Sequence, residues 1–156
     1  MEELVPVCKS NIGLYETFER NYNAHLQNYL SRIYPHNYDQ YEDFIKRHLL
    51  IWNYIYVHQR CIGSFWLEKE TPDNSSATLG IFIDDDSNRG KGVGTHVIMQ
   101  SIKAGAVLLN IQRVELRVRA ANTRAYNCYK NCGFQEIGRF IKNGDFEVVQ
   151  MELLVN

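Results

Sequence analysis

Hydrophobic and polar positions first follow a helical period. Between residues 14 and 30, apolar and aromatic side chains recur every three or four positions, which predicts an amphipathic helix. The Tyr34-Pro35 step interrupts this pattern, because the residue before a proline is pushed out of the helical region. Asp39 and Glu42 then have the spacing of a capping box, which predicts a second helix. A short strand is expected before both helices, near residues 5–9.

From residue 51 the pattern alternates with a period of two, and β-branched and aromatic residues dominate. This alternation predicts three strands, over residues 51–58, 61–69 and 77–84. The helical period returns at residue 93 and predicts a helix to residue 109. The rest of the chain predicts a strand over 112–119, a short helix over 122–132, and strands over 134–140 and 145–155. The chain therefore mixes helices and strands within one continuous order.

Composition and charge narrow the class of protein. The 156 residues are 45% apolar, enough for one compact core, and we expect a single domain over residues 1–156. The 17 Lys and Arg against 18 Asp and Glu leave a net charge of −1, so we expect no nucleic-acid partner. The longest apolar stretch, residues 104–109, is far shorter than the roughly 20 residues of a membrane span. The acidic start does not resemble a secretory peptide, so a cytoplasmic protein without a membrane partner is expected.

The four cysteines are expected to be reduced, because a chain of this size and apolar content needs no disulfides. Cys128 and Cys132 lie four positions apart on a predicted helix. No second pair follows at the spacing of a zinc site, so we expect no metal. Two small side chains packed in the core explain the pair better.

A glycine-rich loop lies between the strand over 77–84 and the helix that follows. It reads Arg89-Gly90-Lys91-Gly92-Val93-Gly94-Thr95. Its backbone N–H groups and the positive end of the helix dipole can converge on an anion, and Arg89, Lys91 and the Thr95 hydroxyl add donors suited to a pyrophosphate. The loop lacks the Gly-Lys-Ser/Thr order of a Walker A loop, and Thr95 stands where a dinucleotide fingerprint needs glycine. A flexible turn without a ligand is the alternative.

A second motif runs from Asn122 to Phe134. Asn122 is a good N-cap and Gly133 a good residue after the C-cap, which predicts a helix of about three turns. Asn122, Tyr126 and Tyr129 fall on one side of this helix, and the small residues Ala125, Cys128 and Cys132 fall about a quarter turn away. For Tyr129, an ordinary packed position is the alternative to a role in chemistry.

These two motifs, in this order, resemble those of the GNAT superfamily of acyl-CoA-dependent N-acetyltransferases. The glycine loop matches the family signature of Arg or Gln, two residues, Gly, one residue, and Gly or Ala, and the second motif matches Asn, two residues, Ala, three residues and Tyr. The resemblance implies one central mixed sheet of about seven strands, mostly antiparallel, with a parallel pair splayed around the cofactor and about four flanking helices. The tail around Asn143-Gly144-Asp145 resembles the closing hairpin of acetylases of ribosomal-protein N-termini and polyamines.

The resemblance also implies the cofactor, acetyl-CoA, and the residues that hold it. The loop amides would hold the pyrophosphate, Asn122 would bond the pantetheine arm, and Tyr129 would protonate the leaving thiolate. The strand before the loop would supply backbone donors to the thioester carbonyl. The cofactor-binding residues are then Ile81, Phe82, Ile83, Arg89, Gly90, Lys91, Gly92, Val93, Gly94, Thr95, Asn122 and Tyr129.

The acceptor side is less defined. An alkylamine has a pKa of about 10.4, so attack on a thioester needs a base or a water path. Strand alternation places Glu115 on the same face as Arg117, which makes Glu115 one candidate base, and Glu68 is a second; a solvated surface carboxylate is the alternative for both. Arg117 stands where the subgroup specific for ribosomal-protein N-termini has a glutamate, and we hypothesise that it binds an acidic group of the acceptor. Tyr34 lies where the family builds its acceptor wall.

The sequence therefore predicts transfer of acetyl from acetyl-CoA to a primary amine by direct attack through a tetrahedral intermediate. The acceptor is left open among a protein N-terminus, a polyamine, an amino acid and an aminoglycoside. The alternative is a non-catalytic acyl-CoA-binding module or sensor on the same fold. The family resemblance is also compatible with a homodimer.

Overall fold

A computed structural model describes residues 2–6, 8, 11, 42–43, 46–83 and 92–155 of the chain. The helix expected over 14–30 lies outside these ranges, as does most of the second expected helix. At the end of that second segment, Glu42, Asp43 and Lys46 are helical, and Lys46 lies 3.0 Å from the Glu42 carboxylate. This four-residue pairing is the one that helices favour.

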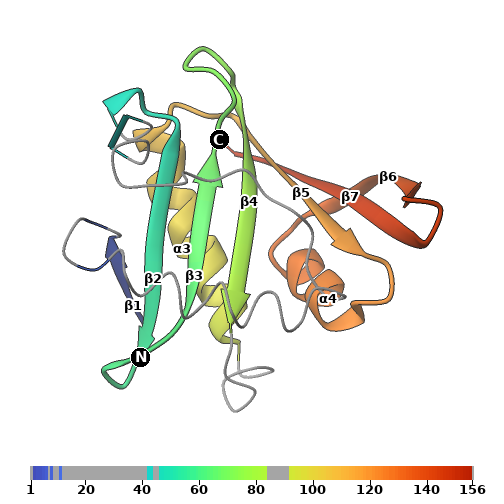
Figure 1. Ribbon diagram of the computed structural model, residues 1–156, viewed down its shortest axis with the longest axis horizontal. Helices are drawn as coiled ribbons and strands as arrows, with labels where there is room; N and C mark the ends of the chain where they lie inside the picture. Colours follow the sequence, from blue (N-terminus) through green and yellow to red (C-terminus); the bar gives the residue numbers. More distant parts are fainter. Residues whose placement is uncertain are drawn as a thin grey trace.

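Seven strands form a single sheet (Figure 1). They are β1 (Glu2–Pro6), β2 (Leu50–Val57), β3 (Arg60–Glu68), β4 (Ser76–Ile83), β5 (Arg113–Arg119), β6 (Gln135–Lys142) and β7 (Phe146–Leu154). Their order is β1-β2-β3-β4-β5-β7-β6, and only β4 and β5 are parallel. The expected α/β class with a mixed, mostly antiparallel sheet of about seven strands is confirmed.

The first strand begins and ends earlier than its pattern predicts, covering residues 2–6 rather than 5–9. Asn11 explains where it ends. The Asn11 side-chain amide donates to the Pro6 carbonyl at 3.0 Å, and the Asn11 Oδ1 accepts from the Cys8 amide at 2.7 Å. These bonds connect Asn11 back to the end of β1, and the pairing of β1 with β2 ends at Pro6.

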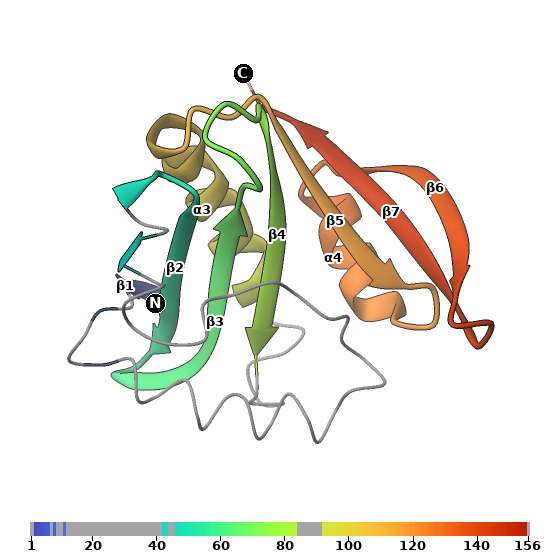
Figure 2. The same cartoon turned by 45° about the horizontal axis from the view of Figure 1, so that its top comes forward.

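The parallel pair at the centre of the sheet is short. The pairing covers three positions, in which Ser76, Ala77 and Thr78 of β4 lie opposite residues 113–115 of β5. The two strands do not pair beyond these residues. Beyond Thr78 the two strands diverge, as both ribbon views show (Figures 1 and 2). The second half of β4 therefore has strand β3 on one side and no described strand on the other.

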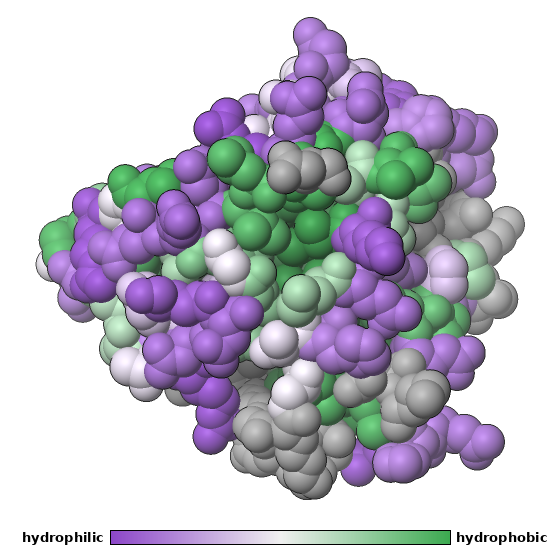
Figure 3. All heavy atoms as spheres, turned by 180° about the vertical axis from the view of Figure 1, so that it is seen from behind, coloured by the Kyte–Doolittle hydropathy of each residue, from purple (hydrophilic) through white to green (hydrophobic). Residues whose placement is uncertain are grey.

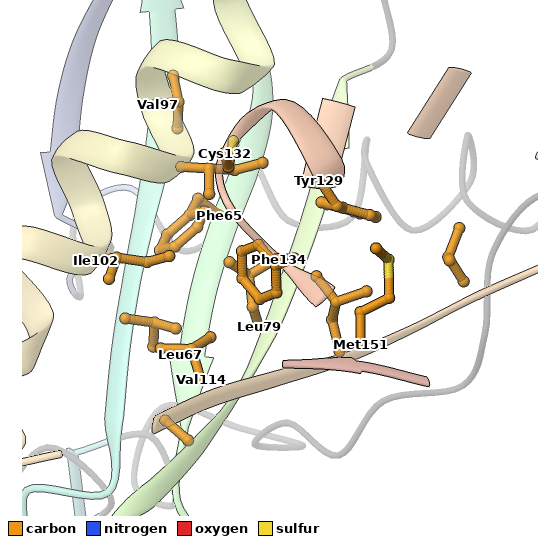
Figure 4. Close-up of a cluster of buried hydrophobic side chains, with 14 of the residues drawn as sticks. Phe65, Leu67, Leu79, Val97, Ile102, Val114, Tyr129, Cys132, Phe134 and Met151 are labelled. Carbon is orange, nitrogen blue, oxygen red and sulfur yellow. The ribbon is translucent and has the colours of Figure 1, made fainter. Parts of the chain in front are cut away.

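Two helices are described, α3 (Val93–Leu108) and α4 (Thr123–Asn131), both within one residue of the expected bounds at their N-terminal ends. Their apolar sides meet one face of the sheet. Figure 4 shows Val97 and Ile102 of α3 beside Phe65 and Leu67 of β3, with Cys132 after α4 nearby. This cluster, which Leu79, Val114, Tyr129, Phe134 and Met151 continue, is the core of the described chain.

Apolar residues also reach the surface on the side of α3. Figure 3 shows them gathered around a hollow in the middle of this face, within a hydrophilic surround. Met99, Val107 and Leu108 of α3 are the large exposed apolar residues on that helix. Among the described residues, no helix is long and apolar enough to cross a membrane.

Candidate active site

The helix α3 begins at a glycine turn. Gly92 is its N-cap and has φ 80°, a left-handed conformation that glycine adopts without strain. No side chain caps this end, and its first turn contains no acidic residue. The first backbone N–H groups of a helix have no partner within it and, with the helix dipole, they favour an anion. Arg89, Gly90 and Lys91, expected to add to this site, lie outside the described residues.

The next turn of α3 packs against α4 and the end of β4. A Cβ atom added at Gly94 would lie 3.5 Å from Cys128 Sγ and 3.8 Å from Ile83 Cδ1, which is ordinary contact. Position 94 therefore accepts glycine or alanine, in agreement with the motif. The Thr95 Oγ1 lies 3.3 Å from Cys128 Sγ, so this hydroxyl, expected to face an anion, is shared with a thiol of α4.

Two thiols lie at this junction. Cys132 Sγ donates to the Thr95 carbonyl at 3.8 Å, and all four cysteines are free. The hydrogen bond from Cys132 and a second from Thr95 lower the pKa of the Cys128 thiol to about 6, against the opposing effect of burial. The same Cys128 contact raises the pKa of Cys132. Of the two thiols, Cys128 therefore loses its proton at the lower pH.

Both ends of α4 form as its sequence predicts. The Asn122 side-chain oxygen accepts from the Ala125 amide at 3.3 Å, which confirms Asn122 as the N-cap. At the other end, Gly133 has φ 101°, its amide bonds to the Lys130 carbonyl, and the Phe134 amide bonds to the Tyr129 carbonyl. These two bonds define a Schellman motif, which ends the helix.

Tyr129 is part of the core. Its side chain is 9% exposed, and its ring meets that of Phe134 edge-on, with centroids 6.0 Å apart (Figure 4). This contact between the third-last helical residue and the residue after glycine is the apolar contact that accompanies a Schellman motif. The Tyr129 ring thus has a structural role that does not depend on the hydroxyl.

The strand residues Ile81, Phe82 and Ile83 lie on β4 past the point where β5 departs. Phe82 is buried, and Ile81 and Ile83 are half-buried. Since β4 has no described strand along this edge, backbone groups that point to that side face the space between β4 and β5. The structure therefore places the expected carbonyl donors beside the divergence of the two strands.

The two candidate bases lie in one row across the sheet. Glu68 is opposite Thr78, and Thr78 is opposite Glu115, so all three side chains point to the same face. This face is turned away from α3, because Leu67, Leu79 and Val114 occupy the opposite one. Arg113 Nε lies 3.6 Å from the Glu115 carboxylate, so Glu115 is ion-paired on the surface.

Arg117 lies on the same face of β5, since Val114, Leu116 and Val118 are buried on the other, as the alternation predicts. Its guanidinium carbon is 5.5 Å from the centroid of the Phe140 ring. Tyr34, the other expected acceptor residue, lies outside the described residues. In the described ranges, no group of three or more His, Cys, Asp and Glu side chains has the arrangement of a metal site.

Two features of this region were not predicted from the sequence. Trp66 of β3 lies across Gly80 of β4, where any Cβ would overlap the indole ring, and the Trp52 indole donates to Ser64 at 2.6 Å. These aromatic side chains line the face that carries Glu68. A tryptophan and a glycine 14 positions apart carry no signal until the register of the hairpin is known.

A parallel pair of strands that diverge, with a glycine turn at the start of a helix beside them, is the arrangement that the resemblance to acyl-CoA-dependent N-acetyltransferases implies. The family model described as Acetyltransferase (GNAT) family matches residues 12–134, and the chain belongs to this family. Members of the family use acetyl-CoA as the acyl donor.

The similar proteins include acetyltransferases of protein N-termini and a spermidine acetyltransferase. An N-alpha-acetyltransferase of Sulfurisphaera tokodaii is 41% identical over 49 residues, which is 31% of this chain and only 29% of that relative. Spermidine N-acetyltransferase from Vibrio cholerae, in complex with CoA and spermine, has a TM-score of 0.74 at 21% identity, covering 98% of this chain and 95% of that one. RimL, a ribosomal L7/L12 alpha-N-protein acetyltransferase in complex with coenzyme A, has a TM-score of 0.79 at 17% identity, covering 99% and 94%. The two structural likenesses show the fold.

Proposed function

We propose that this protein transfers the acetyl group of acetyl-CoA directly to a primary amine. The observation that carries the proposal is the meeting of three elements at Gly94, where an added Cβ atom would be in contact with both Ile83 at the end of β4 and Cys128 of α4. This junction brings the start of α3, the end of β4 and the helix of Tyr129 to one place. Family membership supports the same reaction.

The residues at this junction fit the cofactor. The amides from Gly92 to Thr95 would bind the pyrophosphate, the β4 edge from Ile81 to Ile83 would bond the thioester carbonyl, and Asn122 would contact the pantetheine arm. Acetyl-CoA supplies the activated acyl group. The Asn122 side-chain oxygen already caps α4, so its amide group would make the contact.

Proton transfer defines the remaining roles. A phenol with a pKa of about 10 is well matched to a departing thiolate of about 8.5, so Tyr129 would be the acid. The amine must lose a proton before attack, and Glu68 and Glu115 lie in one row beside the divergence of β4 and β5. Both carboxylates stay candidates for the base, acting directly or through water, and Glu115 would have to do so from its ion pair with Arg113.

Of the four expected classes of acceptor, two are the substrates of similar proteins. The spermidine N-acetyltransferase from Vibrio cholerae acts on a polyamine, and RimL acts on the N-terminus of a ribosomal protein. A homodimer, a single domain over residues 1–156 and a cytoplasmic location stay predictions. A dodecameric structure of the Vibrio cholerae enzyme makes the oligomeric state worth measuring first, by light scattering.

The test is the release of free CoA thiol from acetyl-CoA by the purified protein. The panel contains peptides with varied N-termini, spermidine, amino acids and aminoglycosides. We expect release with one class of amine, a loss of at least tenfold in kcat for Tyr129→Phe, and unchanged affinity for CoA. Tyr126→Phe is the matched control, because Tyr126 lies on the same helix and its hydroxyl bonds to Glu136 instead.

Two other outcomes separate the alternatives. CoA binding without release for any amine would favour the non-catalytic acyl-CoA-binding module, which the burial of Tyr129 against Phe134 makes worth testing. Release that is equal in Tyr129→Phe and the original protein would leave the transferase intact and remove Tyr129 as the acid.

A further inference from the structure

One face of β5 carries three arginines and a glutamate, and the three arginines differ in their partners and exposure. Arg113 lies 3.6 Å from the Glu115 carboxylate and 3.5 Å from that of Glu152. The Arg119 guanidinium carbon is 3.5 Å from the centroid of the Phe146 ring, and its side chain is half-buried. Arg117 differs, because it is exposed and has no ion pair with any residue in the described ranges.

An aromatic ring holds the Arg117 side chain in place. Its guanidinium carbon lies 5.5 Å from the Phe140 centroid, which is within the range of a cation–π contact. A guanidinium that stacks flat on a ring keeps the N–H groups at its edge available to a ligand. Arg117 is therefore oriented and still able to donate.

The surroundings of Arg117 suit a planar anion. Gln150 of β7 lies directly opposite Arg117 on the same face, and Gly138 of β6 lies opposite Gln150. A Cβ added at Gly138 would be 3.5 Å from the Gln150 side-chain oxygen, so the Gln150 amide extends over the glycine. A carboxylate can accept two bonds from a guanidinium fork and a third from a neighbouring amide.

Arg117 and Gln150 lie close to the candidate bases. Pairing of β4 and β5 ends at Thr78 of β4 and Glu115 of β5. Two residues further along, β4 has Gly80, which Trp66 covers, and β5 has Arg117. Two residues along a strand correspond to about 7 Å. An acceptor whose amine approaches the Glu68 and Glu115 row can therefore reach Arg117 with a second group.

We propose that Arg117, with Gln150, binds a carboxylate of the acceptor. The acceptor is then an amine that also carries a carboxylate within several ångströms, such as a peptide N-terminus followed by an acidic residue, rather than a polyamine. This inference rests on the proposed acetyltransferase function and narrows its acceptor to amines that carry a carboxylate.

The experiment compares two peptides that differ only in charge, Ser-Glu-Ala-Ala amide and Ser-Gln-Ala-Ala amide, with spermidine beside them. Thiol release gives kcat/KM for each, and calorimetry gives the affinity of each peptide for the CoA-loaded protein. We expect the glutamate peptide to be preferred about tenfold or more by both measures. Arg117→Gln should remove this preference through KM, and Arg117→Lys should restore part of it.

Arg139→Gln is the control, because Arg139 is ion-paired to Glu136 and Glu147 on the surface, and it should keep the preference. Equal affinity and kcat/KM for the two peptides, or a preference that survives Arg117→Gln, would overturn the inference. Turnover of spermidine with no preference between the peptides would overturn the carboxylate site and leave the acetyltransferase standing. Absence of turnover for every amine counts against the proposed function, while calorimetry still decides whether Arg117 binds the carboxylate.

Discussion

The two halves of the sheet differ in how they are covered. On β3, residues 62–67 are buried without interruption, so both faces of the strand are covered. On β5, buried positions alternate with more exposed ones, and on β6 exposed positions dominate. The outward face of β5 carries ion pairs. The comparison teaches that β2 to β4 form a packed scaffold, whereas the outward face of β5 and β6 carries charged side chains, and it is on this face that we propose acceptor binding.

The largest expected effect tests the packed half. Gly63→Ala places a Cβ onto the Phe82 carbonyl oxygen of the neighbouring strand, and backbone cannot move aside as a side chain can. We expect a loss of about 3 kcal/mol or more in the free energy of unfolding, measured in urea.

Gly138→Ala is the matched substitution in the polar half. Its Cβ would lie 3.5 Å from the Gln150 side-chain oxygen, an ordinary contact, so we expect a change within about 0.5 kcal/mol. Equal losses at the two glycines would contradict the comparison.

A second prediction concerns Lys69, which is only 7% exposed. Its ammonium donates to the Leu109 carbonyl at 2.7 Å, at the C-terminal end of α3, and to the Pro72 carbonyl at 2.9 Å. Lys69→Met leaves both carbonyls without this donor, and we expect a loss of about 2 kcal/mol in urea unfolding. The exposed Lys103→Met on α3 should change stability by less than about 0.5 kcal/mol.

A third prediction separates the two roles of Asn122. Asn122→Ala removes the N-cap of α4 and should cost about 1 kcal/mol. Asn122→Asp keeps the capping oxygen but lacks the amide donor. We therefore expect Asn122→Asp to retain stability and still bind acetyl-CoA more weakly, measured by calorimetry. Normal affinity in Asn122→Asp would remove Asn122 from the cofactor site.

The smallest expected effect on stability lies at the junction of the two halves. Thr95→Val removes the hydroxyl that contacts Cys128 and should cost about 0.5 kcal/mol. It should also raise the pKa of Cys128, which the contacts of Cys132 and Thr95 lower from an ordinary value of 9.0 to about 6.

Because the thiolate is the reactive form, alkylation of Cys128 by iodoacetamide should reach half its maximal rate near pH 6 and rise no further well above it. Peptide mass spectrometry follows the exposed Cys8 in the same sample as an internal reference. A half-maximal pH for Cys128 no lower than that of Cys8 would contradict the assigned hydrogen bonds.

Prediction from sequence succeeded where the deciding interactions are local. The period of apolar residues placed six of the seven strands and both described helices within a few residues, and Asn122 and Gly133 end α4 as expected. It failed at β1, because a side chain five residues further on, Asn11, ends the strand at Pro6. The roles assigned to Glu68, Glu115, Arg117 and Tyr129 stay predictions, although the structure brings the first three to one face of the sheet.

The sequence by itself determined six of the seven strands and the two described helices, because helix period, strand alternation and caps depend on residues two to four positions apart. Only the tertiary structure decided that Thr95 meets Cys128, that Trp66 covers Gly80, and that Arg113 rather than Arg117 pairs with Glu115. These contacts depend on strand register and on the point at which β4 and β5 separate. Both are set by how the whole core packs, and no local pattern along the chain encodes them.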